Sequence, residues 1–227
     1  MNTYITCSNE YGYLLEPFSI LFNKYWPGQQ VVALCYDIPN LKLPDNFQMV
    51  SIGTQGKYWS DALIPFFIKC KDDYFILNLE DMFLVDYVKP DLLSRLEERI
   101  KNGTADKAML HFCNPTRMYD ENTGFLAMKQ NADYRFTIHP SIWSRKYLLK
   151  SLRPSQTVWD FETSRFSYND GGNIICTKEQ GNKIPVFLAS NMYVKGKTQS
   201  TGWGMFGNDD NGLMHEEDIE ILKRFRK

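Results

Sequence analysis

The sequence predicts an α/β fold, a mixed and mainly parallel sheet flanked by helices, in a single domain that covers residues 1–227. A length of 227 residues is in the range of one large domain. In residues 1–80, apolar spacing follows the order strand, helix, strand, strand, helix, strand. That order is typical of a parallel sheet with helices on both faces. The run VVALCY at residues 31–36 has no polar alternation, as expected of a strand buried on both faces.

Turn signals separate the predicted elements of the first part of the chain. Strands are predicted at residues 3–7, 31–36, 48–52 and 74–79, and helices at residues 14–25 and 59–69. The first helix ends at Trp26-Pro27-Gly28, because proline and glycine interrupt helices. Pro65 marks either a kink or a break in the second helix.

The second part of the chain is less regular. Helices are predicted at residues 90–101, 144–152, 157–166 and 216–226, and strands at residues 108–112, 135–138, 174–177 and 186–190. Gly103 follows the first of these helices, as is common at helix ends. Thr157 and Asp160 resemble a capping box at the start of another. A glycine-rich polar stretch occupies residues 196–212.

Composition excludes several classes of protein. A net charge of −1 argues against nucleic acid as the main partner, since phosphate binding needs clustered lysine and arginine. The five cysteines contain no C-x-x-C pair, so neither a zinc site nor a disulfide framework is predicted. No apolar run approaches the roughly 18 residues of a membrane span, and a strand begins too early for a signal peptide. These observations favour a soluble, cytoplasmic protein.

Two acids, Glu80-Asp81, directly follow the strand at residues 74–79. Ligands of open α/β sheets collect beyond the carboxyl ends of the strands, and adjacent acids there can hold a hard divalent cation. An equally supported alternative to cation binding is that one or both acids only cap the next turn. Asp72-Asp73 precede the same strand, at the edge where no ligand is expected, and are interpreted as a turn.

Lys195 and Lys197 belong to a stretch that superficially resembles a P-loop. The P-loop motif needs a glycine where Asn191 stands and a helix where further glycines follow, so that interpretation fails. Two lysines on a glycine-bearing loop can still neutralise a diphosphate. For each lysine taken alone, a solvated side chain is the more common role.

The segment Trp159-Asp160-Phe161-Glu162 opens a predicted helix. Acids in a first turn are favoured by the helix dipole, so Asp160 is expected to cap the helix. A carboxylate beside an aromatic ring can alternatively be a general base for a hydroxyl group. His215, just before the last helix, is either an ordinary polar residue at a helix start or a residue that closes over a bound metal.

Three segments together resemble GT-A-type nucleotide-sugar glycosyltransferases of bacteria and their viruses. They are YITCSNE at residues 4–10, YFILNLEDMFLVDYV at residues 74–88, and HPSIWSRKYLLKSLRPSQTVWDFE at residues 139–162. The resemblance implies a GT-A-like, Rossmann-like domain with a nucleotide-binding half at residues 1–88 and an acceptor-binding half at residues 89–227. It also implies a glycosyltransferase that moves a sugar from a nucleotide diphosphate to the hydroxyl of a glycan or another acceptor.

The same resemblance implies roles for individual residues. Glu80-Asp81 match an Asp-x-Asp-like motif that holds Mn²⁺ or Mg²⁺, with Asn78 where a first acid could stand and His215 as a further ligand. The residues expected against the base, ribose and diphosphate are Thr6, Cys7, Ser8, Asp37, Lys195 and Lys197. Either Asp160 or Glu162 would deprotonate the acceptor, and Trp143 and Trp159 would face its sugar.

Two alternative functions are compatible with the sequence. A nucleotidyltransferase on a similar scaffold usually carries a basic, glycine-rich loop after the first strand, whereas residues 7–13 contain one glycine and no lysine or arginine. A non-catalytic protein that binds nucleotide sugars or glycans would explain the incomplete acidic motif. The sequence does not choose the donor sugar, the acceptor, inversion or retention, metal dependence, or the oligomeric state.

Overall fold

The structure is a computed structural model that describes residues 1–111, 113–181, 186–187, 189–194, 197–203 and 215–225. The strands are β1 (Thr3–Cys7), β2 (Val31–Cys35), β3 (Phe47–Ser51), β4 (Tyr74–Leu79), β5 (Met82–Leu84), β6 (Lys107–Met109), β7 (Met118–Asp120), β8 (Phe125–Met128), β9 (Ser141–Ser144), β10 (Ile174–Thr177), β11 (Ala189–Val194) and β12 (Lys197–Trp203). The α-helices are α1 (Leu15–Tyr25), α2 (Trp59–Lys69), α3 (Pro90–Lys101), α4 (Arg145–Ser151), α5 (Val158–Glu162), α6 (Lys178–Gly181) and α7 (Glu216–Lys223).

The described strands form one large mixed sheet in the order β3-β2-β1-β4-β9-β6-β10-β8-β7 and a small sheet in the order β12-β11-β5. Strands β3, β2, β1 and β4 are parallel to their neighbours within this group, whereas β9 is antiparallel to both β4 and β6. This arrangement confirms the predicted α/β class with a mixed sheet. In the order β3-β2-β1-β4, the topological switch point lies between β1 and β4, where open α/β sheets bind ligands.

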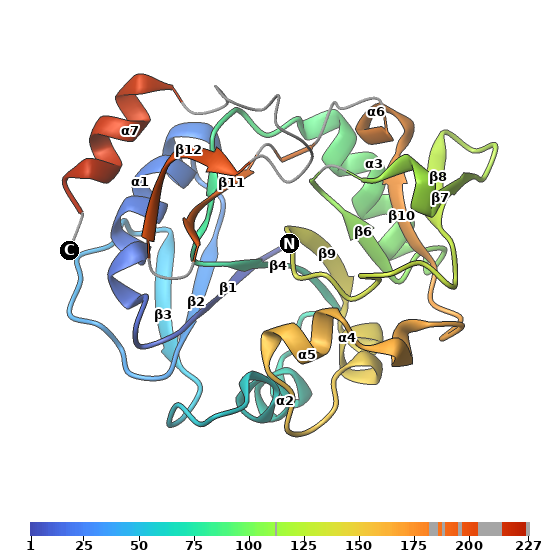
Figure 1. Cartoon of the computed structure of the whole chain (residues 1–227), viewed down its shortest axis with the longest axis horizontal. Helices are drawn as coiled ribbons and strands as arrows, with labels where there is room; N and C mark the ends of the chain where they lie inside the picture. Colours follow the sequence, from blue (N-terminus) through green and yellow to red (C-terminus); the bar gives the residue numbers. More distant parts are fainter. Residues whose placement is uncertain (112, 182–185, 188, 195–196, 204–214, 226–227) are drawn as a thin grey trace.

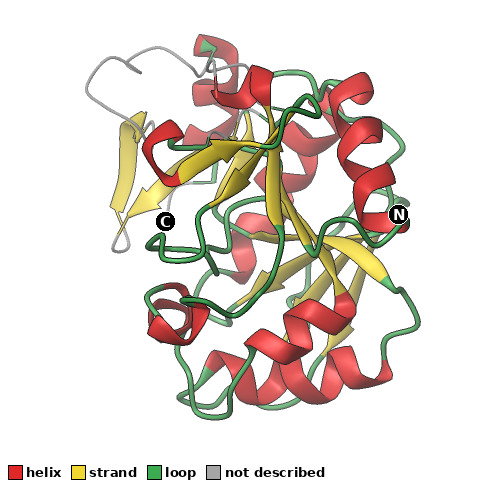
Figure 2. Ribbon diagram, turned by 90° about the vertical axis from the view of Figure 1, so that its right-hand side faces the viewer, coloured by secondary structure: helices red, strands yellow, loops and turns green. Residues whose placement is uncertain are grey.

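Helices cover both faces of the large sheet (Figure 2). On one face, α1 buries side chains such as Phe18 and α3 packs side chains such as Leu96 over β6, β9 and β10, in one core cluster with Ile5 of β1. On the other face, α2, α4 and α5 pack Phe67 and Phe161 against the sheet. Every residue of β1 is buried, because side chains on both of its faces are covered. Figure 1 shows α2, α4 and α5 gathered at one end of the molecule.

Several predicted bounds agree with the structure, including α2, β4, α3 and β10, and Pro65 lies inside α2. The predicted strand at residues 135–138 is wrong, because this segment is a buried turn and coil. The side chain of Lys107 binds the carbonyl groups of Arg135 and Thr137, with Nζ–O distances of 3.1 and 2.6 Å. The carbonyl groups of Arg135 and Thr137 are therefore satisfied by a side chain and need no neighbouring strand.

Other bounds differ from the prediction, among them the strand expected at residues 108–112, which is β6 at Lys107–Met109. The strand expected at residues 186–190 begins at Ala189, and the helix expected at residues 157–166 ends at Glu162. The described residues contain no helix whose length and apolar character would let it cross a membrane.

Candidate active site

A cavity of about 400 Å³ lies at the carboxyl ends of β1 and β4, at the switch point of the sheet. This volume is within the range of small-molecule sites. Its walls come from the ends of β1, β2 and β4, the segment between β3 and α2, and the start of α5. The lining residues are Thr6, Cys7, Ser8, Tyr11, Leu34, Tyr36, Ile52, Gln55, Gly56, Lys57, Trp59, Leu79, Glu80, Asp81, Thr157, Val158 and Trp159.

Glu80 and Asp81 lie where the chain passes from the large sheet to the small one. β4 pairs with β1 in the large sheet, and β5, which begins directly after Asp81, pairs with β11 in the small sheet. The backbone nitrogen and Oγ of Ser8 lie 3.3 and 3.5 Å from Oε1 of Glu80, which accepts their hydrogen bonds. Burial, together with the nearby Asp81, raises the pKa of Glu80 to about 8. Without a counter-charge this carboxyl group is therefore largely protonated at neutral pH.

These two carboxyl groups fit a hard divalent cation. Mg²⁺ is commonly held by one or two protein carboxylates together with substrate phosphates, rather than by a complete cage of side chains. A buried carboxyl group with a raised pKa is one whose ionised form a cation would stabilise. Within the described residues, no group of three His, Cys, Asp or Glu side chains is arranged to hold a metal. Glu80 and Asp81 would therefore need ligand oxygens to complete a coordination shell.

His215 does not lie with these acids. α1 starts beyond β1 at the carboxyl edge of the sheet and runs back for 11 residues, about 16 Å. Its last residue is Tyr25, and the ring of His215 stacks on that ring with 6.3 Å between centroids. His215 does not line the cavity, and within the described residues Glu80, Asp81 and His215 do not form a group arranged to hold a metal, so the expectation that His215 closes over a metal beside these acids does not fit.

The short helix α5 is anchored by one buried side chain. Phe161 is fully buried and stacks on Phe136, with ring centroids 5.2 Å apart. Because Phe161 faces the core, Trp159 faces outward and is 63% exposed at the wall of the cavity. Glu80 and Asp81 thus share one cavity with Thr157, Val158 and Trp159 at the start of α5.

Both acids of α5 have defined hydrogen-bond partners. Asp160 forms the predicted capping box with Thr157, whose side chain and backbone lower the pKa of the Asp160 carboxyl. Oε1 of Glu162 accepts hydrogen bonds from the backbone nitrogen of Ile138 at 2.7 Å and from Oγ1 of Thr137 at 3.0 Å. Glu162 thus ties α5 to the coil segment at residues 135–138, whereas Asp160 stays exposed.

Trp143 is a core residue. It is 0% exposed, and the Nζ atom of Lys107 lies 4.3 Å from the centroid of its ring. The expectation that Trp143 faces an acceptor sugar is therefore wrong, because its position in β9 between β4 and β6 buries the ring. Of the two lysines expected at the diphosphate, Lys195 lies outside the described residues. Lys197 begins β12, and its side chain also lies outside the described part.

Comparisons with known proteins identify the fold. No protein-family model and no curated protein sequence matches the chain. Among solved structures, the mannosyltransferase PcManGT from Pyrobaculum calidifontis, in complex with GDP-Man and Mn²⁺, matches with a TM-score of 0.51 and 13% identity. The match covers 77% of this chain and 53% of that chain. The fold is GT-A-like.

Two further structures match this GT-A-like chain. The bifunctional IspDF from Campylobacter jejuni matches with a TM-score of 0.43 and 15% identity, over 77% of this chain and 48% of that chain. The galactosyltransferase LgtC, in complex with donor and acceptor sugar analogs, matches with a TM-score of 0.44 and 11% identity, over 66% of this chain and 60% of that chain. The chain therefore spans about half to three fifths of the matched proteins.

The GT-A-like sheet brings further residues to the cavity that the sequence analysis missed. Tyr36 follows β2, while Gln55 and Lys57 lie between β3 and α2. Asn9 links this region, because its backbone nitrogen donates to Oε1 of Gln55 at 2.7 Å and its Oδ1 accepts from the backbone nitrogen of Asp37 at 2.9 Å. Asp37 is thus held beside the cavity and does not line it. The rule that pointed to Glu80, that carboxyl ends of parallel strands share one edge, also applies after β2 and β3.

Proposed function

We propose that the protein is a glycosyltransferase that moves a sugar from a nucleotide-diphosphate sugar to a hydroxyl group of a glycan or another acceptor. The observation that carries this proposal is that Glu80, Asp81 and the start of α5 line one cavity at the switch point of a GT-A-like sheet. The GT-A-like mannosyltransferase from Pyrobaculum calidifontis, solved with GDP-Man and Mn²⁺, supports the same donor class and metal.

The donor nucleotide is assigned to the half of the chain formed by residues 1–88. In this proposal, Thr6, Cys7 and Ser8 contact the base and ribose, with Asp37 beside them. Tyr36 and Ile52 add apolar surface for a flat base. Among the described residues, Lys57 is the cation in the cavity wall, and it would lie near the diphosphate. Lys195 and Lys197 are retained as diphosphate-binding residues on the basis of the sequence.

Glu80 and Asp81 would hold the divalent cation, Mn²⁺ or Mg²⁺, together with oxygens of the diphosphate. When bound, such a cation stabilises the negative charge that develops on a leaving diphosphate. Ser8 orients Glu80 through its two hydrogen bonds, so the carboxyl group is positioned before a ligand arrives. In the transfer, the acceptor oxygen loses its proton and bonds to the anomeric carbon, and the diphosphate leaves with the electrons of the broken C–O bond.

Asp160 is the better candidate for the base that takes this proton. Both acids accept hydrogen bonds, but Asp160 is exposed and follows Trp159 at the cavity wall, whereas Glu162 is half-buried. Asp160→Asn and Thr157→Ala separate the two possible roles, because both disturb the cap and only the first removes the carboxylate. If Asp160 is the base, only Asp160→Asn loses turnover. If Asp160 is only a helix cap, both variants lose about 1 kcal/mol of stability and keep the turnover of the wild type.

The test of the proposed function is a turnover screen over nucleotide sugars and acceptors, with and without Mn²⁺. We expect release of a nucleoside diphosphate from one donor class, abolished in Asp81→Asn and retained in the control Glu10→Gln, which changes an exposed acid. Turnover that is unchanged in Asp81→Asn would remove the metal assignment. Release of pyrophosphate from a nucleoside triphosphate would identify a nucleotidyltransferase. Binding of nucleotide sugars without turnover would identify a binding protein.

A further inference from the structure

We propose that the acceptor is an oligosaccharide carrying an anionic group, and that it binds along an acceptor strip formed by Trp159, Tyr134 and Arg117. This inference rests on the proposed function and specifies its acceptor. The strip begins at the cavity, because Trp159 is one of the lining residues. It continues over a part of the surface that the reaction itself does not use.

The three side chains come from separate segments and form a continuous row. The ring of Trp159 in α5 lies edge-on to that of Tyr134, with centroids 6.3 Å apart. The guanidinium carbon of Arg117, in the 3-10 helix Pro115–Arg117, lies 5.3 Å from the centroid of the Tyr134 ring. Trp159 is 63% exposed and Tyr134 is 37% exposed, so both rings are accessible to a ligand.

The backbone of Tyr134 is in an uncommon conformation. Its φ is +59°, in the left-handed region that aromatic residues rarely occupy. Such strained residues cluster at functional sites, where the surrounding structure holds them. The ring is not needed to fill the core, since more than a third of Tyr134 is exposed. An exposed aromatic ring on a residue with a strained backbone conformation indicates a ligand-binding surface.

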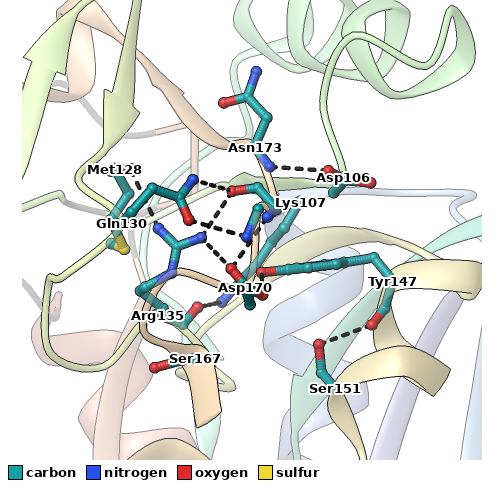
Figure 3. Close-up of polar contacts among 12 residues, drawn as sticks. Asp106, Lys107, Met128, Gln130, Arg135, Tyr147, Ser151, Ser167, Asp170 and Asn173 are labelled. Carbon is teal, nitrogen blue, oxygen red and sulfur yellow. Dashed lines mark hydrogen bonds and ion pairs between the residues drawn. The ribbon is translucent and has the colours of Figure 1, made fainter. Parts of the chain in front are cut away.

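The next residue, Arg135, anchors this turn. It is fully buried, and its guanidinium donates to Oδ1 of Asp170 at 2.7 Å and to the carbonyl oxygens of Lys129 and Gly172 at 2.9 and 2.7 Å. Figure 3 shows Arg135 and Asp170 at the centre of this network. Tyr134 is therefore presented from a fixed turn, which lowers the entropy lost when a ligand binds.

The chemistry of the strip matches a charged sugar chain. Exposed tryptophan and tyrosine rings offer flat apolar faces with a polar edge, which suit the faces of sugar rings. Arg117 adds a guanidinium, which pairs with planar carboxylates and with phosphates. None of the ion pairs in the described part of the chain involves Arg117, and the neighbouring acid Asp133 accepts a hydrogen bond from the hydroxyl of Tyr168. An acceptor sugar in the cavity followed by sugars over Trp159 and Tyr134 places an anionic group at Arg117.

The test is calorimetric binding of uncharged glucans, phosphorylated glucans and oligogalacturonides of one to four sugars to the full chain with donor nucleotide present. We expect affinity to increase with length and to be higher for the charged series, and the two charged series distinguish a phosphate from a carboxylate. Tyr134→Asn, which suits a positive φ, and Arg117→Met should each weaken binding of the favoured charged series about tenfold. Binding of the uncharged glucans should change in Tyr134→Asn only.

The matched control is Phe166→Ala, which removes an exposed ring that also carries an arginine, Arg153, 5.8 Å from its centroid but does not line the cavity. Its affinity for oligosaccharides should equal that of the wild type. Equal binding of charged and uncharged acceptors, or unchanged binding in both strip variants, would overturn the inference. If the wild type transfers sugar while the strip variants behave normally, the acceptor strip fails and the proposed function stands.

Discussion

Replacing Glu80 by glutamine removes a carboxyl group whose ionised form the folded protein cannot easily solvate. The side chain is 7% exposed, and burial followed by the charge of Asp81 raises its pKa from the ordinary 4.5 to about 8. Each pKa unit corresponds to about 1.4 kcal/mol. Between pH 4.5 and 8 the folded protein holds a proton that the unfolded chain has released, so this group lowers the free energy of unfolding as pH rises. Relative to its value below pH 4.5, the free energy of unfolding is lower by about 3 kcal/mol at pH 7 and by about 5 kcal/mol above pH 8.

Glu80→Gln should therefore be more stable than the wild type by about 3 kcal/mol at pH 7, with little difference near pH 4.5. Glutamine still offers an oxygen to the two hydrogen bonds from Ser8. Urea unfolding at pH 5, 7 and 9 measures the difference, and Glu10→Gln controls for the loss of an exposed carboxylate. A difference between Glu80→Gln and the wild type that stays constant from pH 5 to 9 would refute the reasoning.

The same variant should lose function while it gains stability. In the wild type a divalent cation must displace the proton of Glu80, so Mn²⁺ affinity should fall about tenfold for each pH unit below 8. Titration of Mn²⁺ in the presence of a nucleoside diphosphate at pH 6, 7 and 8 measures this slope. In Glu80→Gln, binding should be weak and independent of pH over this range. A steep slope that persists in Glu80→Gln would place the titrating group elsewhere.

Further predictions concern stability and acceptor use. Arg135→Met leaves the buried Asp170 without its ion pair and should lower the free energy of unfolding in urea by about 3–5 kcal/mol, whereas Arg145→Met, which removes an exposed ion pair, should change it by less than about 1 kcal/mol. Trp143→Ala should cost about 3–5 kcal/mol in the same assay because it empties a core position. Trp159→Ala should change stability by less than about 0.5 kcal/mol and raise the KM for the acceptor in steady-state kinetics. Equal losses of stability in the two tryptophan variants would contradict the assigned positions.

The parts of the fold that the sequence predicts depend on local patterns. The bounds of β4 and α2 agree because continuous apolar runs and helical spacing encode burial directly in the neighbouring residues. The capping box of Thr157 and Asp160 is likewise a local signal that the structure confirms. A similarly simple rule, that carboxyl ends of parallel strands form one edge, points to Glu80 and Asp81 from the order of the residues alone.

The parts that the sequence does not predict depend on distant partners. Residues 135–138 have the composition of a strand, but their backbone groups are bound by Lys107 and Glu162, each more than 20 positions away. The sequence around Trp143 and Trp159 does not show which of the two rings is buried. Trp143 is buried because β9 lies inside the large sheet, whereas Trp159 lies on the surface. The place of His215 depends on α7 packing on the far end of α1.

The most direct test of the account is whether nucleotide sugars stabilise the protein in a divalent-metal-dependent manner. The measurement is the melting temperature of the wild type with a panel of nucleotide-diphosphate sugars, each with Mn²⁺ and with a chelator. A ligand at about 100 times its Kd adds about 2.7 kcal/mol, which corresponds to a rise of roughly 5–10 °C for a chain of this size. We predict such a rise for one donor class with Mn²⁺, a small rise with chelator, and none in Asp81→Asn. An unchanged melting temperature with every nucleotide sugar in the presence of Mn²⁺ would contradict the assignment of the cavity.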